Sequence, residues 1–241
     1  MTSSHAEGQL EEATEQYTVA VQLYTDLYGT ENPSTAIALH NLGLCYNASA
    51  DGAKGMDQLM IREQAKAAFE DALASQKAVA AILATMDGEA EAAARIKGEE
   101  TTALTMASLA GVLRELKQPD KAAEMLAAAL ALLETDVAGE EVLGSPTREL
   151  AKATVINNLG YHYRHLQQFD DAVAMYIRAL DIRTPRLGKA HQDTISTRHN
   201  LAEVLLLMGN DDAAHEVQQG ILQDLGAFDG GNSTDDEDRR K

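Results

Sequence analysis

The chain has 241 residues and a formal net charge of −18, with 45% hydrophobic and 24% charged residues. Such a surface would repel phosphate backbones and anionic lipid headgroups, so the charge argues against nucleic-acid binding and against binding at a membrane surface. No apolar run in the sequence approaches the roughly 20 residues that span a bilayer, so we expect no membrane insertion.

The pattern of apolar residues and of helix start and stop signals predicts helices along most of the chain and no strands. Pro33, Pro119 and Pro146 mark helix starts, and Gly29 and Gly188 mark helix ends. Helices are expected at residues 9–28, 34–49, 57–86, 99–117, 119–135, 147–167, 169–184, 191–209 and 211–226.

Other segments lack a clear helical pattern. We expect surface loops at residues 47–56 and 135–145, and at residues 87–99 either a loop or an extension of the following helix. Residues 1–8 are expected to form a flexible N-terminus. Residues 227–241 carry dense negative charge without apolar periodicity, which predicts a disordered acidic tail.

A motif of small and large residues repeats along the chain. Its clearest copy consists of Leu159, Gly160, Tyr163, Ala172, Tyr176 and Ala179. Further copies start at Leu42, Leu109 and Leu201, and the last one follows the clearest copy at an interval of 42 residues. The small residues let two helices approach closely, and the large residues fill the space between helix pairs. Stacked pairs bury together an apolar face that one pair leaves exposed.

This motif resembles the tetratricopeptide repeat, and its long interval resembles the kinesin light chain type of that repeat. Residues 28–35 and 187–194 are similar to that family's linker, Leu-Gly-x-x-His-Pro-x-Thr. The resemblance implies an all-α fold, a right-handed superhelical solenoid of antiparallel helix pairs. The array would cover residues 9–226. It would comprise a half-repeat at 9–28, whose first helix is not in this chain, and repeats at about 34–86, 99–135, 147–184 and 191–226.

The resemblance also implies that the first helices of the repeats line a concave groove that holds a peptide or a helix. The positions expected to face inward hold Ile37, His40, Leu44, Asn47, Leu104, Ala107, Gly111, Arg114, Thr154, Asn157, Tyr161, Arg164, Ser196, His199, Glu203 and Leu206. The candidate partner-binding residues are chosen from these and from a recurring asparagine position. These candidates are His40, Asn41, Leu44, Arg114, Asn157, Asn158, Tyr161, Arg164, His199, Asn200 and Glu203.

Two details restrict the ligand of this groove. The paired Lys and Asn of the chaperone-type carboxylate clamp are absent from the inward-facing positions, which argues against chaperone C-terminal tails as ligands. Asn41, Asn158 and Asn200 recur at one repeat position. They either hydrogen-bond a bound backbone or bond to an adjacent helix or linker, and both interpretations stay open.

Signals for catalysis and metal binding are weak. Cys45 is the only cysteine and lies among apolar residues, so we expect a buried thiol that acts as a small apolar group. His162 and His165 lie on neighbouring turns without a third ligand at a suitable spacing. We therefore expect no metal ion, no cofactor and no enzymatic activity.

Two functions follow from these observations. The first is a protein–protein interaction scaffold that binds a peptide or helical segment of a partner, for example a basic one, in the groove. The alternative is a permanent structural subunit or assembly factor of a larger multiprotein complex, held through its edges and loops. An apolar face expected at Leu10, Tyr17, Val21 and Tyr24 favours the alternative, because an exposed face would need a cover. Without a visible signal, transit or transmembrane segment we expect a cytoplasmic protein, or a mitochondrial one if a presequence has been removed.

Overall fold

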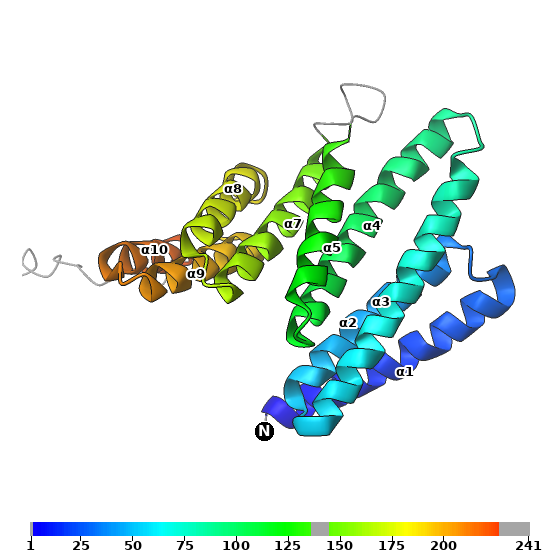
Figure 1. Ribbon diagram of the computed structural model, residues 1–241, viewed down its shortest axis with the longest axis horizontal. Helices are drawn as coiled ribbons and strands as arrows, with labels where there is room; N and C mark the ends of the chain where they lie inside the picture. Colours follow the sequence, from blue (N-terminus) through cyan, green and yellow to red (C-terminus); the bar gives the residue numbers. More distant parts are fainter. Residues whose placement is uncertain (1, 136–144, 227–241) are drawn as a thin grey trace, which may run out of the picture. The chain divides into compact units, whose positions relative to one another are not determined.

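A computed structural model describes residues 2–135 and 145–226, and within these ranges every regular element is a helix (Figure 1). The fold class expected from the sequence, an all-α solenoid, is confirmed. The helices are α1 (Thr2–Tyr28), α2 (Pro33–Gly52), α3 (Gly55–Leu83), α4 (Glu89–Glu115), α5 (Pro119–Glu134), α7 (Pro146–His165), α8 (Phe169–Leu187), α9 (Gln192–Leu207) and α10 (Asp211–Asp224).

Three expected boundaries differ from the structure. α1 begins at Thr2, so residues 2–8 belong to this helix, whereas the helix was expected to begin at residue 9. The segment 89–99 is helical, which decides between the two alternatives for this part of the chain. The loop expected at residues 47–56 is wrong, because only Ala53 and Lys54 separate α2 from α3. The expected loop at 135–145 and the expected tail at 227–241 lie almost wholly outside the described residues.

Hydrogen bonds between α2 and α3 explain the short connection. Arg62 of α3 donates from Nη1 to Asn47 Oδ1 at 2.8 Å and from Nη2 to Asp51 Oδ1 at 2.7 Å. The Gln58 side chain of α3 donates to the carbonyl of Ala50 at 3.1 Å. These contacts bind the last turn of α2 to the first turns of α3. Local composition therefore predicted a loop where tertiary contacts stabilise a helix.

The chain divides into two compact units, residues 1–162 and residues 163–241. In the first unit α1 packs on α2, α2 on α3, α3 on α4, and α4 on α5. In the second unit α8 packs on α9 and α9 on α10. We call α2, α4, α7 and α9 first helices, and α1, α3, α5, α8 and α10 second helices. Where the structure describes the connections between consecutive helices, they are short, as expected of antiparallel pairs.

The repeat motif forms the cores of both units. The second helices contribute side chains with no exposed surface: Ala65, Phe69 and Ala72 of α3, Ala122, Leu126 and Ala129 of α5, and Ala172, Tyr176 and Ala179 of α8. Gly43 of α2 shows why the facing position must be small. A Cβ atom added there would lie 2.8 Å from ring carbons of Phe69. The small motif residue therefore sets how closely α2 approaches α3.

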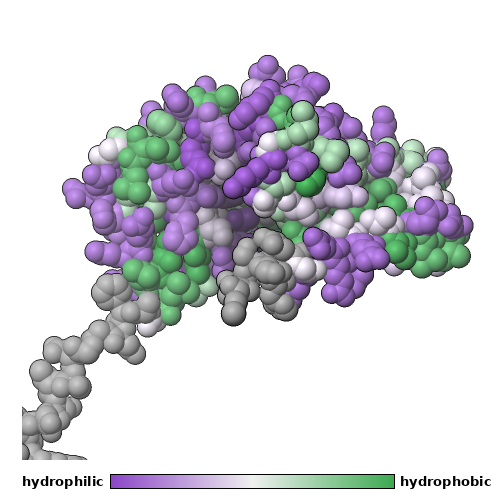
Figure 2. All heavy atoms as spheres, turned by 90° about the horizontal axis from the view of Figure 1, so that it is seen from below, coloured by the Kyte–Doolittle hydropathy of each residue, from purple (hydrophilic) through white to green (hydrophobic). Residues whose placement is uncertain are grey.

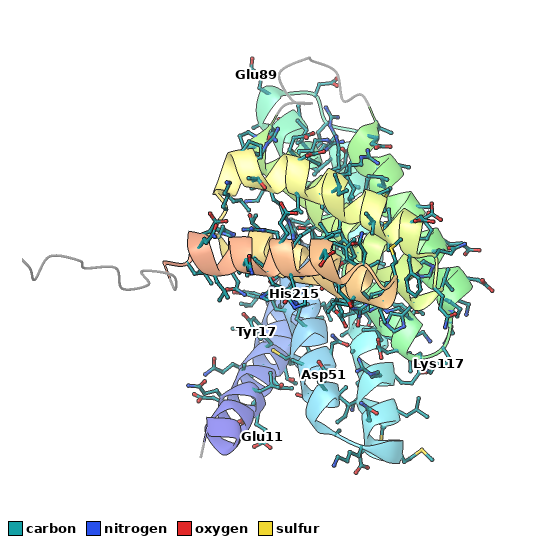
Figure 3. The ribbon with its side chains drawn as sticks, turned by 90° about the vertical axis from the view of Figure 1, so that its left-hand side faces the viewer. Glu11, Tyr17, Asp51, Glu89, Lys117 and His215 are labelled. Carbon is teal, nitrogen blue, oxygen red and sulfur yellow. The ribbon has the colours of Figure 1, made fainter. Side chains whose placement is uncertain are left out.

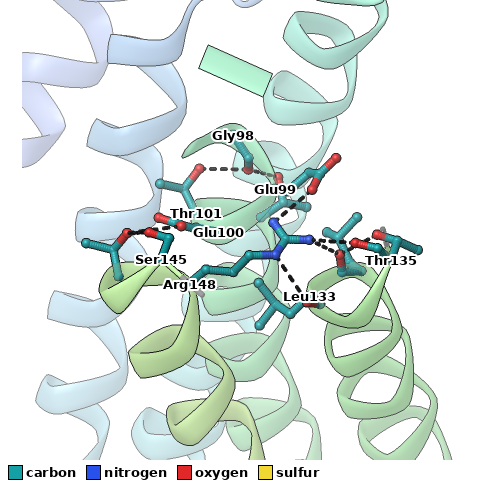
Figure 4. A network of polar contacts seen from close by, with 11 residues as sticks. Gly98, Glu99, Glu100, Thr101, Leu133, Thr135, Ser145 and Arg148 are labelled. Carbon is teal, nitrogen blue, oxygen red and sulfur yellow. Dashed lines mark hydrogen bonds and ion pairs between the residues drawn. The ribbon is translucent and has the colours of Figure 1, made fainter. Parts of the chain in front are cut away.

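A buried arginine joins three helices of the first unit (Figure 4). Arg148 of α7 has no exposed surface. Its guanidinium donates to the carbonyls of Leu132 at 2.9 Å and Leu133 at 3.2 Å, and it pairs with Glu99 of α4 at 3.0 Å. The last carbonyls of a helix have no partner within the helix, so Arg148 satisfies the C-terminal end of α5. Sequence reasoning missed this role.

The exposed apolar face of α1 is not the one expected from the sequence. Leu10, Tyr17, Val21 and Tyr24 are half-buried, and the more exposed apolar residues lie elsewhere on the helix. They are Val19, 61% exposed, Leu23, 52% exposed, and Leu27, 61% exposed. The side of α1 that the sequence predicted to be exposed is therefore the side that packs against α2.

Candidate partner-binding groove

The first unit contains an open pocket of about 290 Å³. Four helices supply its lining. The residues are Asn47 and Asp51 of α2, Arg62 of α3, Gly111, Arg114 and Glu115 of α4, and Tyr161 of α7. Three of these helices are consecutive first helices, which is the arrangement that the groove hypothesis expects. The structure thus brings together the candidates Arg114 and Tyr161 with the inward-facing Asn47 and Gly111.

Arg114 is held in place on one side of the pocket. The carbon atom of its guanidinium lies 4.2 Å from the centroid of the Tyr161 ring, a cation–π arrangement between α4 and α7. Its Nε atom lies 3.6 Å from a carboxylate oxygen of Glu115. Only 14% of the Arg114 side chain is exposed, so its position is fixed before any ligand arrives. A fixed side chain loses little conformational entropy on binding.

Arg62 is the second cation at this pocket. Its hydrogen bonds to Asn47 and Asp51 fix the guanidinium, and 9% of its side chain is exposed. The Asp51 side chain is 68% exposed, and Figure 3 shows this residue at the end of α2. Two arginines and two carboxylates therefore line the pocket and balance each other's charge. The lining offers donors, acceptors and an aromatic ring, which suits polar recognition of a peptide.

His40 has contacts within the protein. Its Nδ1 atom lies 3.0 Å from Oγ1 of Thr105 on α4, and its ring packs edge-on against Phe69 of α3, with centroids 5.5 Å apart. Burial lowers the pKa of His40, because the charged imidazolium loses hydration there. The imidazole therefore helps to pack α2 against α3 and α4, which is a structural contribution that the sequence did not indicate.

The remaining candidates are distributed over both units. In the first unit Leu44 is exposed, and Asn41, Asn157 and Asn158 are half-buried. In the second unit Arg164 pairs with Glu203, which joins the end of α7 to α9. His199 is exposed and Asn200 is half-buried. The structure groups Arg164 with Glu203 but assigns none of these residues a ligand.

Arg62, Asp51 and Glu115 line the pocket although sequence reasoning did not select them. Arg62 lies on a second helix, whereas the candidates were taken from first helices, and Asp51 lies in the expected loop. Asn47 and Asp51 are four residues apart, a spacing that puts both on one face of a helix. If the predicted helix had continued to Gly52, the spacing of Asn47 and Asp51 would have indicated that one side chain binds both residues.

Other chemistry has little support among the described residues. They contain no group of three or more His, Cys, Asp or Glu side chains that is able to hold a metal ion. In residues 2–135 and 145–226 no helix is long and apolar enough to cross a membrane. Cys45 is buried as expected. Burial raises the pKa of its thiol, and a hydrogen bond with Thr14 opposes this shift.

Comparison with known families agrees with the repeat pattern. A family model for the tetratricopeptide repeat matches residues 151–220. Residues 151–220 thus carry tetratricopeptide repeats. Two solved structures of putative kinesin light chain TPR-like repeats from Podospora anserina are similar to this repeat protein, each at 17% identity and a TM-score of 0.56. The first, a variant with one substitution, aligns over 91% of this chain and 88% of its own; the second aligns over 93% and 90%.

The likeness to these structures is one of fold. No curated protein matches the sequence of this repeat protein. Tetratricopeptide repeats generally mediate protein–protein interaction or complex assembly, and proteins built from them are typically non-enzymatic. Stacked repeats present extended surfaces, which explains why proteins are their usual partners.

Proposed function

We propose that this protein is a non-enzymatic scaffold that binds a peptide or a helical segment of a partner protein at the pocket of the first unit. The observation that carries this proposal is the fixed pair of Arg114 and Tyr161 at the rim of a polar depression between α4 and α7. Tyr and Arg are enriched among the residues that dominate binding energy at protein interfaces.

The polar lining of the pocket favours a side chain over a cofactor. Sites for small molecules usually enclose about 300–1,000 Å³, and they are mostly apolar. This pocket has about 290 Å³ and a lining of charged and amide side chains. It has room for one or two side chains of a bound segment. The rest of such a segment would lie along the first helices.

Apolar residues extend the surface beside the pocket. Ile37 and Leu44 of α2 are 50% and 43% exposed, and they lie seven residues apart, which places both on one face of the helix. Asn47, one turn further along, reaches the pocket. An amphipathic segment would cover the apolar residues and would place a polar side chain at Arg114.

Selection from a displayed peptide library on the full chain tests this proposal. Selected peptides are expected to lose at least about tenfold in affinity on Tyr161→Ala or Arg114→Gln, since one such loss corresponds to about 1.4 kcal/mol. Lys121→Gln, at an exposed position of α5, is the matched control and should keep the affinity. Circular dichroism verifies that each variant is folded. Peptides that bind both pocket variants as tightly as the control would place the site elsewhere.

A further inference from the structure

α1 carries the same motif positions as the second helices α3 and α5. Its motif positions Ala13, Tyr17 and Ala20 are only half-buried. The equivalent positions of α3 and α5 have no exposed surface. In the first unit α3 packs between α2 and α4, whereas the main packing partner of α1 among the described helices is α2. Among the described residues, the motif positions of α1 are therefore less covered than those of α3 and α5.

An exposed apolar row lies on the neighbouring side of α1. Val19, Leu23 and Leu27 follow one another at intervals of four residues, so they form a row along the helix. More than half of each side chain's surface is exposed. Figure 1 shows α1 at the edge of the first unit, and the space-filling view in Figure 2 shows hydrophobic patches among the hydrophilic surface. Contiguous exposed apolar residues of this kind mark interaction sites.

The charges beside this row are of one sign. Glu12, Glu15 and Asp26 are exposed, and helical periodicity places them on the same side of α1 as Val19 and Leu23. The sequence contains neither Lys nor Arg before Lys54. A second copy of this face would bring the same carboxylates opposite one another, and like charges repel. The row thus favours an occupant with the opposite charge.

We propose that α1 binds an amphipathic, basic α-helix of a partner, which packs on its exposed side as a first helix packs on a second helix in this array. The repeat geometry defines this ligand. A small residue of the partner helix would lie against Ala13 and Ala20, as Gly43 lies against α3, and apolar residues would cover the row. Lys or Arg residues at its flanks would pair with Glu12, Glu15 and Asp26. This is recognition of a helix by a hydrophobic groove with charged rims.

A synthetic copy of α7, residues 146–165, is a suitable probe. It is a first helix of this same array, and it carries Gly160 at the small motif position together with Arg148, Lys152 and Arg164. Binding to the full chain is measured by fluorescence anisotropy. We expect saturable binding that is weakened at least about tenfold by Leu23→Glu and not by Leu222→Glu, a matched exposed leucine of α10.

A charge exchange tests the electrostatic part. The triple variant Glu12→Lys, Glu15→Lys, Asp26→Lys should bind the probe at least about tenfold more weakly. It should prefer a probe in which Arg148, Lys152 and Arg164 are replaced by Glu. Failure of this exchange, or equal binding to the Leu23→Glu and Leu222→Glu variants, would overturn the proposal.

Two further outcomes are informative. Sedimentation of the full chain as a dimer that Leu23→Glu dissociates would show that a second copy covers α1, and this result also overturns the proposal. The Tyr161→Ala variant should bind the α7 probe as the unaltered chain does. Since Tyr161 lies in the pocket and not on α1, this measurement separates failure of the α1 site from failure of the pocket.

Discussion

At the residue scale, small side chains decide how closely the helices approach. Gly43 of α2 lies against the Phe69 ring of α3. A Cβ atom added at Gly43 would lie 2.8 Å from ring carbons of Phe69. A Cβ atom added at Gly98, in the middle of α4, would lie in open space. Both glycines lie within helices, but only Gly43 contacts a side chain of another helix. A comparison of the two positions therefore separates the effect of packing from the effect of glycine on helix stability.

The substitution Gly43→Ala is expected to lower the free energy of unfolding by about 1–3 kcal/mol, because Phe69 has no exposed surface and must shift. Gly98→Ala is the control and should raise it by about 0.5–1 kcal/mol, since glycine is a poor helix former. Urea titration followed by circular dichroism measures both values. A Gly43→Ala protein as stable as the Gly98→Ala protein would mean that the ring moves away at no cost.

At the element scale, buried arginines join helix ends to their neighbours. Arg148 satisfies the last carbonyls of α5 and pairs with Glu99 of α4. In the second unit Arg183 of α8 has a comparable role, because it donates to the Asp193 carbonyl at 3.0 Å and to Thr197 Oγ1 at 2.6 Å at the start of α9. A planar guanidinium donates to several carbonyls at once, which the ammonium of Lys does less well.

We expect Arg148→Lys to lower the free energy of unfolding by about 2–4 kcal/mol, because hydrogen bonds of a buried charged group are lost. Lys97→Met, at an exposed position of α4, is the control and should change it by less than about 0.5 kcal/mol. The urea midpoint and amide exchange in the last turn of α5 are measured together. Unchanged exchange there would contradict the capping role.

At the scale of the whole molecule, the two units have separate cores. One cluster of buried apolar residues centres on helices of the first unit and includes Phe69 and Leu126, and another in the second unit includes Tyr176 and Leu201. In a stacked array each repeat contacts only its neighbours, so stability is close to a sum of local contributions. A core defect should therefore act mainly in its own unit.

Phe69→Ala should remove about 3–5 kcal/mol of local stability, because it leaves a cavity between α2 and α3. Native-state hydrogen exchange is expected to accelerate most in α2, α3 and α4 and least in α9 and α10. Tyr176→Ala is the reciprocal variant and should reverse this order. Equal acceleration in both units by either variant would show that the array unfolds as a single cooperative body.

The candidate site was predictable only in part. Repeat positions selected Arg114 and Tyr161, and the structure brings both to one pocket. The same reasoning missed Arg62, because it lies on a second helix, and it did not anticipate that His40 bonds to Thr105. Periodicity reports which face of one helix is apolar. It does not report which side chains of different helices meet.

The sequence by itself predicted the class of fold, because its helix signals and the spacing of small and large residues indicate closely packed helix pairs. The resemblance of its clearest motif copy to the tetratricopeptide repeat predicted the repeat type, and the family model matches residues 151–220. Only the tertiary structure decided which face of α1 is open, where Arg148 binds and how the pocket is lined. The reason is physical: a repeat motif encodes contacts between adjacent helices, whereas polar side chains find partners according to the distances that the packed array creates.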